Sequence, residues 1–274
     1  QQGATNTTTS LNDYSVIVSQ TGASQTNNVS LSLSCSGNDN NGYWFALSNP
    51  FMGRLDISKF LTANTGINTI ITGKTVYTYN AISGWEGKNT GEIYPAQGFM
   101  VAKSSSGSLS ISINANQQIG KVGNKESNVN EIKPLSDMIT FIVQANGIEK
   151  KVYANINERA ENGFDDNDAF ALFSNNNENI IDPYFEVENK NIFKNEFKSL
   201  PYQVPINFHS SKASEVRLSA HNIPNDVNVS IIDITTNEER DLRDSDFCFV
   251  ANIGENENRF IVSFSKNEVG INDI

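Results

Sequence analysis

The segment Val-Ser-Leu-Ser-Leu-Ser at residues 29–34 alternates apolar and polar side chains without a break. Successive side chains of a β-strand point to opposite faces of a sheet, so this pattern predicts a strand with one buried and one exposed face. Residues 108–113 (Ser-Leu-Ser-Ile-Ser-Ile) repeat the pattern, and it recurs at residues 216–220, 227–231 and 260–264. These segments predict antiparallel sheets whose inner faces pack in a core.

The segments between these strands are rich in Gly, Asn, Asp and Ser, as at residues 36–42, and predict turns. Many short strands separated by turns predict an all-β fold of two β-sandwich, jelly-roll-like modules. One short helix is expected at residues 56–63, where Ile57, Phe60 and Leu61 fall at helical spacing and Asp56 can cap the first turn.

The chain of 274 residues is long enough for two such modules. Residues 117–133 are polar and show no alternation, which predicts a linker. We therefore expect an N-terminal β-sandwich at residues 1–116, a jelly-roll-like C-terminal β-sandwich at 134–265, and a tail at 266–274.

The charge balance argues against several classes of partner. The formal net charge is −11, and no Lys/Arg stripe is present to bind phosphates, so we expect no nucleic-acid partner. No apolar run approaches the ~20 residues that a spanning helix needs, so we expect no membrane span. The first residues lack the basic and apolar segments of a signal peptide, and we expect export after its removal.

The two cysteines, Cys35 and Cys248, both lie in strand-like segments. We expect two buried free thiols in different modules, because Cys is among the residues most often buried. A disulfide between the modules and a metal site are the alternatives that this spacing leaves.

Several short motifs resemble one family. The most specific is Pro-Ala-Gln-Gly-Phe-Met-Val at residues 95–101, after Trp85 and a strand-like segment at residues 75–80. The other matching segments are residues 44–51 (Trp-Phe-Ala-Leu-Ser-Asn-Pro-Phe), 163–169 (Gly-Phe-Asp-Asp-Asn-Asp-Ala), 240–242 and 259–264. In this order they resemble Bacteroidetes surface proteins exported by type IX secretion, in the region before a C-terminal sorting module. Ala46-Leu47-Ser48 departs from the Gly that usually precedes Asn-Pro.

The resemblance implies a non-enzymatic secreted or cell-surface protein with a structural or adhesin-like role. It implies no shared catalytic residues and no common ligand. We expect an extracellular or outer-surface location, a monomer, and contact with a glycan or a protein on a host or neighbouring cell. The alternative function is a carbohydrate-binding module, with or without the help of calcium.

The sharpest candidate metal site is the turn that holds Asp165, Asp166 and Asp168. Carboxylates supply the oxygen ligands that calcium requires, although the spacing is not that of an EF-hand. The competing interpretation is a solvated turn in which Asp side chains accept backbone N–H groups. Adjacent acids in one turn cannot face each other across a sugar, so a glycosidase pair is disfavoured.

Trp85, Tyr79 and Tyr94 are the candidate ligand-binding residues, because exposed aromatic faces can stack on sugar rings. Trp85 is expected in a loop, where it can also fold back over a sheet edge. Trp44 and Phe99 are expected in the core. His209 and His221 are expected at surface or edge positions, and no catalytic residue is predicted. A degradative enzyme with an atypical site is the third hypothesis.

Overall fold

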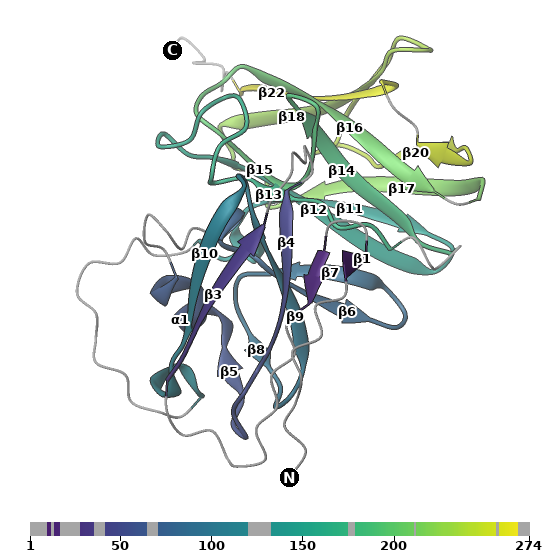
Figure 1. Ribbon diagram of the computed structural model, residues 1–274. Helices are drawn as coiled ribbons and strands as arrows, with labels where there is room; N and C mark the ends of the chain where they lie inside the picture. The colour runs from purple at the N-terminus through teal and green to yellow at the C-terminus, as the bar shows by residue number, and fades with distance from the viewer. Residues whose placement is uncertain are drawn as a thin grey trace. The chain divides into compact units, whose positions relative to one another are not determined.

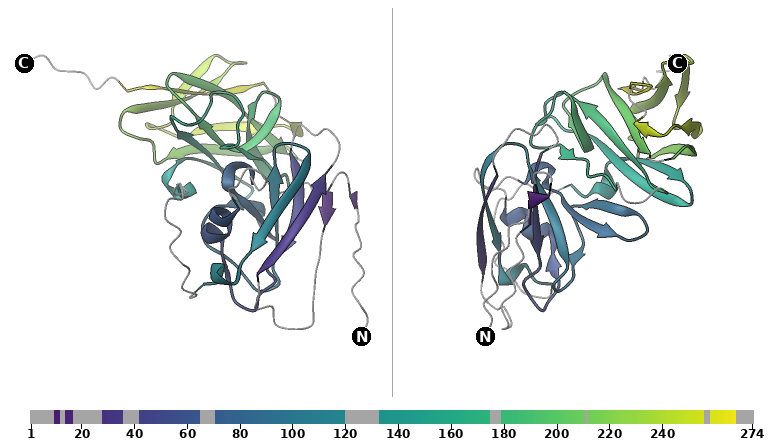
Figure 2. Two further views of the ribbon diagram at one scale, coloured as in Figure 1. Left: turned by 60° about the vertical axis from the view of Figure 1, so that its left-hand side comes forward. Right: turned by 45° about the vertical axis from the view of Figure 1, so that its right-hand side comes forward.

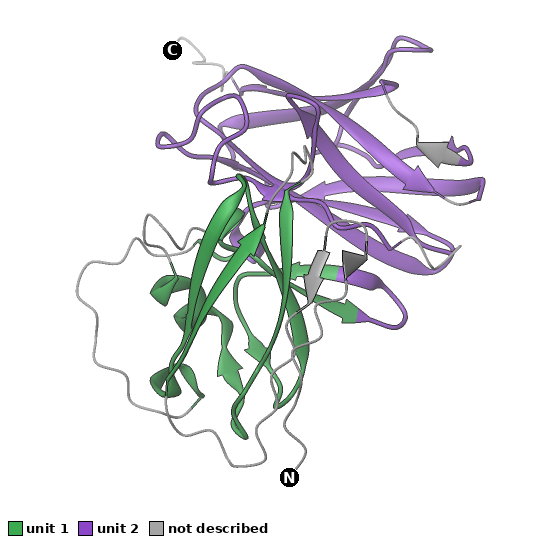
Figure 3. Cartoon of the chain, in the orientation of Figure 1, with its two compact units in different colours: residues 1–79, 86–134 green, residues 80–85, 135–274 purple. Residues whose placement is uncertain are grey.

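The computed structural model of the chain describes residues 10–11, 14–16, 28–35, 42–64, 71–119, 133–174, 179–210, 212–255 and 258–267. These residues form an all-β protein with one short α-helix (Figure 1). The chain divides into two compact units (Figure 3). Unit 1 comprises residues 1–79 and 86–134, and unit 2 comprises residues 80–85 and 135–274.

Unit 1 contains short strands, the helix and two single-turn 3-10 helices. Its strands are β1 (Ser10–Leu11), β2 (Tyr14–Val16), β3 (Val29–Cys35), β4 (Tyr43–Ser48), β5 (Leu55–Asp56), β6 (Val76–Asn80), β7 (Gly84–Lys88), β8 (Glu92–Ile93), β9 (Gly98–Lys103) and β10 (Gly107–Ile113). The helices are α1 (Ile57–Ala63), η1 (Thr72–Lys74) and η2 (Ala115–Gln117). The sheet order is β1-β2-β4-β9-β6-β7, with β10-β3 and β5-β8 as separate pairs.

The alternating segments of unit 1 form strands as predicted. β3 and β10 pair antiparallel with Leu33 opposite Leu109, and both side chains are buried. The helix is also confirmed, since the Asp56 side chain accepts a hydrogen bond from Lys59 N and so caps its first turn. Figure 2 shows α1 beside β10, to which Asn64 at the end of the helix is joined through both backbone groups of Ser112.

Unit 2 is built on one long, curled sheet. Its strands are β11 (Ile139–Ala145), β12 (Ile148–Ile156), β13 (Ala169–Phe170), β14 (Ile181–Val187), β15 (Lys190–Phe197), β16 (Tyr202–Ser210), β17 (Ser214–His221), β18 (Val227–Asp233), β19 (Glu238–Asp241), β20 (Phe247–Ala251), β21 (Gly254–Glu255) and β22 (Phe260–Lys266), preceded by the 3-10 turn η3 (Leu135–Asp137). The order is β19-β18-β22-β16-β14-β15-β12-β11-β17-β20; β13 pairs with β15, and β21 with β16.

A ring contact shows that this sheet folds back on itself. The rings of Phe141 on β11 and Phe264 on β22 lie 6.1 Å apart, although four strands separate β11 from β22 in the sheet order. Phe141 also contacts Phe185 on β14. The two halves of the sheet therefore enclose one aromatic-rich core, which is sandwich packing.

Part of the outer face of the unit 2 sheet is also buried. Asp182 on β14 lies on that face, because its neighbours Ile181 and Phe185 point into the core. Its carboxylate forms an ion pair of 2.9 Å with Lys150 and accepts a hydrogen bond from Ser174 N. Lys150 Nζ also donates to the carbonyls of Ser83 and Trp85. Residues 80–85 are thus held to β12 and β14 by one buried ammonium group.

Two expectations need correction. Trp85 lies in β7, not in a loop, and is half-buried. Cys248 is exposed and Cys35 is half-buried, so the expectation of two buried thiols is wrong, although both are free. On β20 the inward positions belong to Phe247, Phe249 and Ala251, which turns Cys248 outward. Trp44 and Phe99 are buried in unit 1 as predicted.

The units divide between Pro134 and Leu135, at the end of the predicted linker. Residues 120–132 of that linker and residues 268–274 of the predicted tail lie outside the described part of the chain. The assignment of residues 80–85 to unit 2 was not expected from the sequence. Among the described residues, the search for a helix of the length and apolarity that a bilayer span requires found none.

Candidate functional site

The acidic turn is held by its own backbone. Asp165 accepts hydrogen bonds from the backbone N–H groups of Glu161 and Asn167. Asp168 accepts from the backbone N–H groups of Asp165 and Glu196, while Asp166 is exposed. These bonds match the interpretation of a structural turn. The described residues contain no group of three or more His, Cys, Asp or Glu placed to hold a metal ion, and calcium binding stays a prediction.

Asp168 belongs to a buried ionic cluster that the sequence did not reveal. It is fully buried beside β15, where Lys194 and Glu196 form a buried ion pair of 2.6 Å. Asn155 and Asn157 donate to the second oxygen of Glu196. Burial raises the pKa of Asp168 to about 7, against the opposing effect of its two backbone N–H donors. The cluster holds the turn onto the sheet, and every polar group in it has a partner.

The aromatic candidates differ in exposure. Trp85, on β7, is half-buried, and its backbone N–H donates a hydrogen bond to Ser174 Oγ. Tyr79, on β6, and Tyr94, after β8, are each about half exposed, at 50% and 56%. The Arg54 guanidinium lies 5.3 Å from the centre of the Tyr94 ring, so one face of that ring is already covered.

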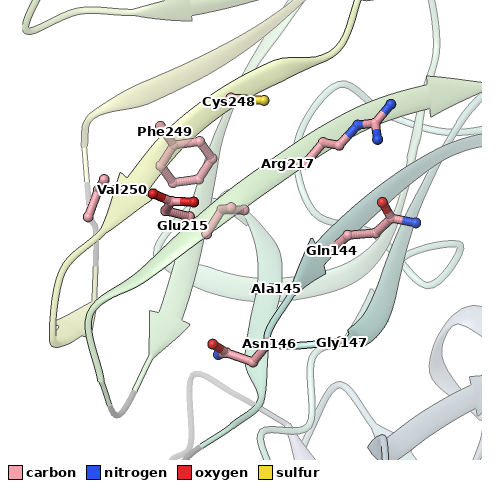
Figure 4. Close-up of a pocket in the computed structure, with 10 residues that line it drawn as sticks. Gln144, Ala145, Asn146, Gly147, Glu215, Arg217, Cys248, Phe249 and Val250 are labelled. Carbon is pink, nitrogen blue, oxygen red and sulfur yellow. The ribbon is translucent and has the colours of Figure 1, made fainter.

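In unit 2, a depression on the outer face of β11, β17 and β20 is lined by several exposed polar side chains. It has a volume of about 600 Å³, which is within the range of ligand pockets. Its lining residues are Gln144, Ala145, Asn146, Gly147, Glu215, Val216, Arg217, Cys248, Phe249 and Val250 (Figure 4).

Strand register explains why these side chains lie together. Arg217 pairs with Gln144 on one side and with Cys248 on the other, and Glu215 pairs with Val250. Side chains of directly opposed residues lie within contact distance on the same face of an antiparallel sheet. Gln144, Glu215, Arg217, Cys248 and Val250 are all exposed, because the alternate positions of each strand fill the core.

The turn at the end of the depression is rigidly built. Asn146 and Gly147 connect β11 to β12 with φ of 54° and 76°, the conformation that a two-residue hairpin needs. The Asn146 side chain donates to Asn179 O and to Ser214 Oγ. The depression is therefore preformed at this end rather than lined by a loose loop.

Electrostatically, the depression is weakly acidic. The Arg217 guanidinium contacts the Asp246 carboxylate through both Nε and Nη2, which compensates its charge. Glu215 adds a second carboxylate. Gln144 donates to Glu149 at 3.3 Å, and that carboxylate is also paired with Lys151. The arrangement offers hydrogen-bonding groups without an excess of positive charge.

The sequence alone does not reveal this site, because its residues come from three strands that are distant along the chain. The alternation at residues 216–220 indicates that Arg217 faces outward, but not which strands lie beside it. Gln144 and Cys248 are far from Arg217 in the sequence, and only the pairing of β17 with β11 and β20 brings the three together. The sequence therefore predicts which polar residues point outward on each strand, but it does not predict which strands are neighbours in the sheet.

Comparison of the chain with protein-family models, with curated proteins and with solved structures gave no match. The resemblance to type IX-exported surface proteins therefore stays a prediction.

Proposed function

We propose that the chain is a non-enzymatic, secreted or cell-surface protein with an adhesin-like role, and that the depression on β11, β17 and β20 is its contact surface. One observation carries this proposal: Gln144, Glu215 and Arg217 present exposed polar groups side by side on a rigid sheet face. Sites built on strands hold their side chains more firmly than sites on loops.

The other charged clusters of unit 2 support the choice of this surface, because their polar groups already have partners. The carboxylates of Asp165 and Asp168 are occupied by backbone N–H groups, and Lys150 and Asp182 are occupied by each other and by residues 80–85. In contrast, the side chains of Gln144, Glu215 and Arg217 that line the depression are exposed (Figure 4). The motifs that resemble exported surface proteins agree with this role and with an extracellular location.

Adhesion of coated microspheres tests the proposal. Microspheres that carry the purified full chain are passed over surfaces coated with neutral polysaccharide, sulfated polysaccharide or serum protein. We expect retention on at least one surface, and a large loss of retention when Gln144 and Glu215 are both replaced by Ala. Glu158→Ala is the matched control, because Glu158 is an exposed carboxylate of the same unit outside the depression. Retention on no surface, or equal retention by the double variant, would overturn the proposal.

A further inference from the structure

The charges of the side chains at the depression disfavour some classes of ligand. The guanidinium of Arg217 is compensated by Asp246, and Glu215 contributes a carboxylate to the same lining. The carboxylate of Glu215 therefore adds a negative charge beside an already compensated Arg217–Asp246 pair, in a chain whose formal net charge is −11. Like charges disfavour association, so sulfated, sialylated or phosphorylated ligands are poor partners for this surface.

The hydrogen-bonding groups suit a ligand rich in hydroxyls. A carboxylate accepts hydrogen bonds through two oxygens, an amide both donates and accepts, and a guanidinium donates in a fixed plane. Glu215, Gln144 and Arg217 supply one of each, at cross-strand spacing on two neighbouring strands. Adjacent hydroxyls of a sugar ring both donate and accept, and so can engage these three groups together.

The depression also has an apolar side. Val250 is 52% exposed and is the apolar side chain that the outer face of β20 presents to the depression. A sugar ring carries C–H groups on its faces, so a neutral oligosaccharide can cover this apolar surface while its hydroxyls reach Glu215 across the strand pair. Ligand sites commonly combine an apolar wall with a few placed polar groups.

An extended peptide fits this place less well. Peptides often add a strand to the edge of a sheet, and β20 ends the strand order next to the depression. However, Arg259 Nη1 already donates to the carbonyl of Val250 at 3.2 Å. One acceptor position of the Val250 carbonyl is therefore already occupied by a side-chain donor, which disfavours the pairing of a new strand at this residue.

We infer that the depression lined by Gln144, Glu215, Arg217 and Val250 binds a neutral oligosaccharide. This inference rests on the proposed function, because it names the ligand class of the same contact surface. The binding is by contact alone and requires no reaction.

Nuclear magnetic resonance titration of the full chain tests the inference. The probes are neutral tetrasaccharides of glucose, mannose, xylose and N-acetylglucosamine, a sulfated heparin tetrasaccharide, and a lysine-rich peptide. We expect at least one neutral tetrasaccharide to shift the amide signals of β11, β17 and β20. Glu215→Ala should weaken that binding about tenfold or more, the effect of removing one charged hydrogen-bonding group. Glu158→Ala should leave the binding unchanged.

The outcomes separate this inference from the broader proposal. If microspheres adhere through the depression but no neutral tetrasaccharide shifts these signals, the sugar inference fails and the contact-surface proposal stands. Stronger binding of the heparin fragment or of the lysine-rich peptide, or sugar binding that survives Glu215→Ala, also overturns the inference. A folded amide spectrum of each variant shows whether the substitution has left the sheet intact.

Discussion

Arg259 and Asp233 form the polar junction at one end of the unit 2 core. The Arg259 Nε and Nη2 atoms lie 3.2 and 2.9 Å from the same Asp233 carboxylate oxygen. The guanidinium also lies 4.6 Å from the centre of the Phe260 ring. Asp233 is buried, and its other oxygen accepts from the backbone and side chain of Thr235. One arginine thus satisfies a buried carboxylate and covers the aromatic core.

This junction predicts a loss of stability in acid. Burial raises the pKa of Asp233, but the hydrogen bonds from Arg259 and Thr235 outweigh it and lower the pKa to about 2. A lowered folded-state pKa contributes stability above the unfolded value near 4, and that stability is lost as the pH falls towards 2. We expect Asp233 to contribute about 2 kcal/mol to this loss. Urea denaturation at pH 5 and pH 2.5 measures it. If Asp233→Asn shows the same acid loss as the parent, the pair is not its source.

For Asp168 we expect the opposite dependence of stability on pH. Its folded-state pKa is raised to about 7 by burial, so the folded protein retains a proton that the unfolded chain releases near pH 4. Its contribution to stability is therefore complete below pH 4 and is lost as the pH rises through 7. The loss should reach about 4 kcal/mol. The carbon resonance of the Asp168 carboxyl should titrate near neutrality, and a carboxyl already ionised at pH 5 would contradict the prediction.

Local sequence patterns predicted the alternating strands and the helix correctly. They did not predict the environments of Asp168 and Asp233, which depend on residues distant in the sequence. Strict alternation fixed the strands at residues 29–35 and 107–113, and Asp56 marked the start of α1, because both signals lie within a few neighbouring residues. The burial of Asp168 depends instead on β15, and the position of Asp233 depends on Arg259. Both partners are more than 20 residues away in the sequence.

The candidate site likewise depends on contacts between residues that are distant in the sequence. Alternation turns Arg217 outward, but only strand order places it between Gln144 and Cys248. Trp85 was expected in a loop because Ser83 and Gly84 precede it and Gly87 follows. It forms a strand, and its backbone groups bond Ser174 and Lys150. Glycine-rich sequence weakens a strand prediction, and tertiary contacts decided the outcome here.

The buried pair of Lys150 and Asp182 should matter far more than its exposed neighbour. Lys150→Met leaves the Asp182 carboxylate buried without its cation, and we expect a loss of about 3–5 kcal/mol in the free energy of unfolding. Lys151→Met is the matched control on the same strand, since its pair with Glu149 is largely exposed and should cost less than about 1 kcal/mol. Equal losses in urea denaturation would show that burial of the pair is not decisive. A second substitution, Asp182→Asn, should recover part of the Lys150→Met loss.

The two thiols should react at different rates. Cys248 is exposed on β20, whereas Cys35 is half-buried and its sulfur lies 3.5 Å from the carbonyl oxygen of Gly107. Access controls the reaction of a thiol with a disulfide reagent, so Cys248 should be modified first in the folded protein. Absorbance after addition of an aromatic disulfide reagent should show a fast and a slow phase. Cys248→Ser should remove the fast phase, and its persistence would contradict the exposed position.

Alanine substitutions at Gly84 and Gly147 should distinguish the effect of steric crowding from that of backbone strain. Gly84 and Gly147 have nearly equal φ values of 75° and 76°, so an alanine meets similar conformational strain at both positions. A Cβ atom at Gly84 would lie 2.0 Å from Ser174 Oγ and 2.9 Å from Ile180 Cδ1, whereas one at Gly147 would have no atom within 4 Å. Gly147→Ala should cost about 1 kcal/mol, from the left-handed backbone alone. Gly84→Ala should cost a further 1–3 kcal/mol or so, because Ser174 and Ile180 must move. Thermal and urea denaturation of the two variants measure the difference. Equal costs would mean that residues 80–85 are not packed closely against Ser174, and that the contacts of Lys150 alone hold them in unit 2.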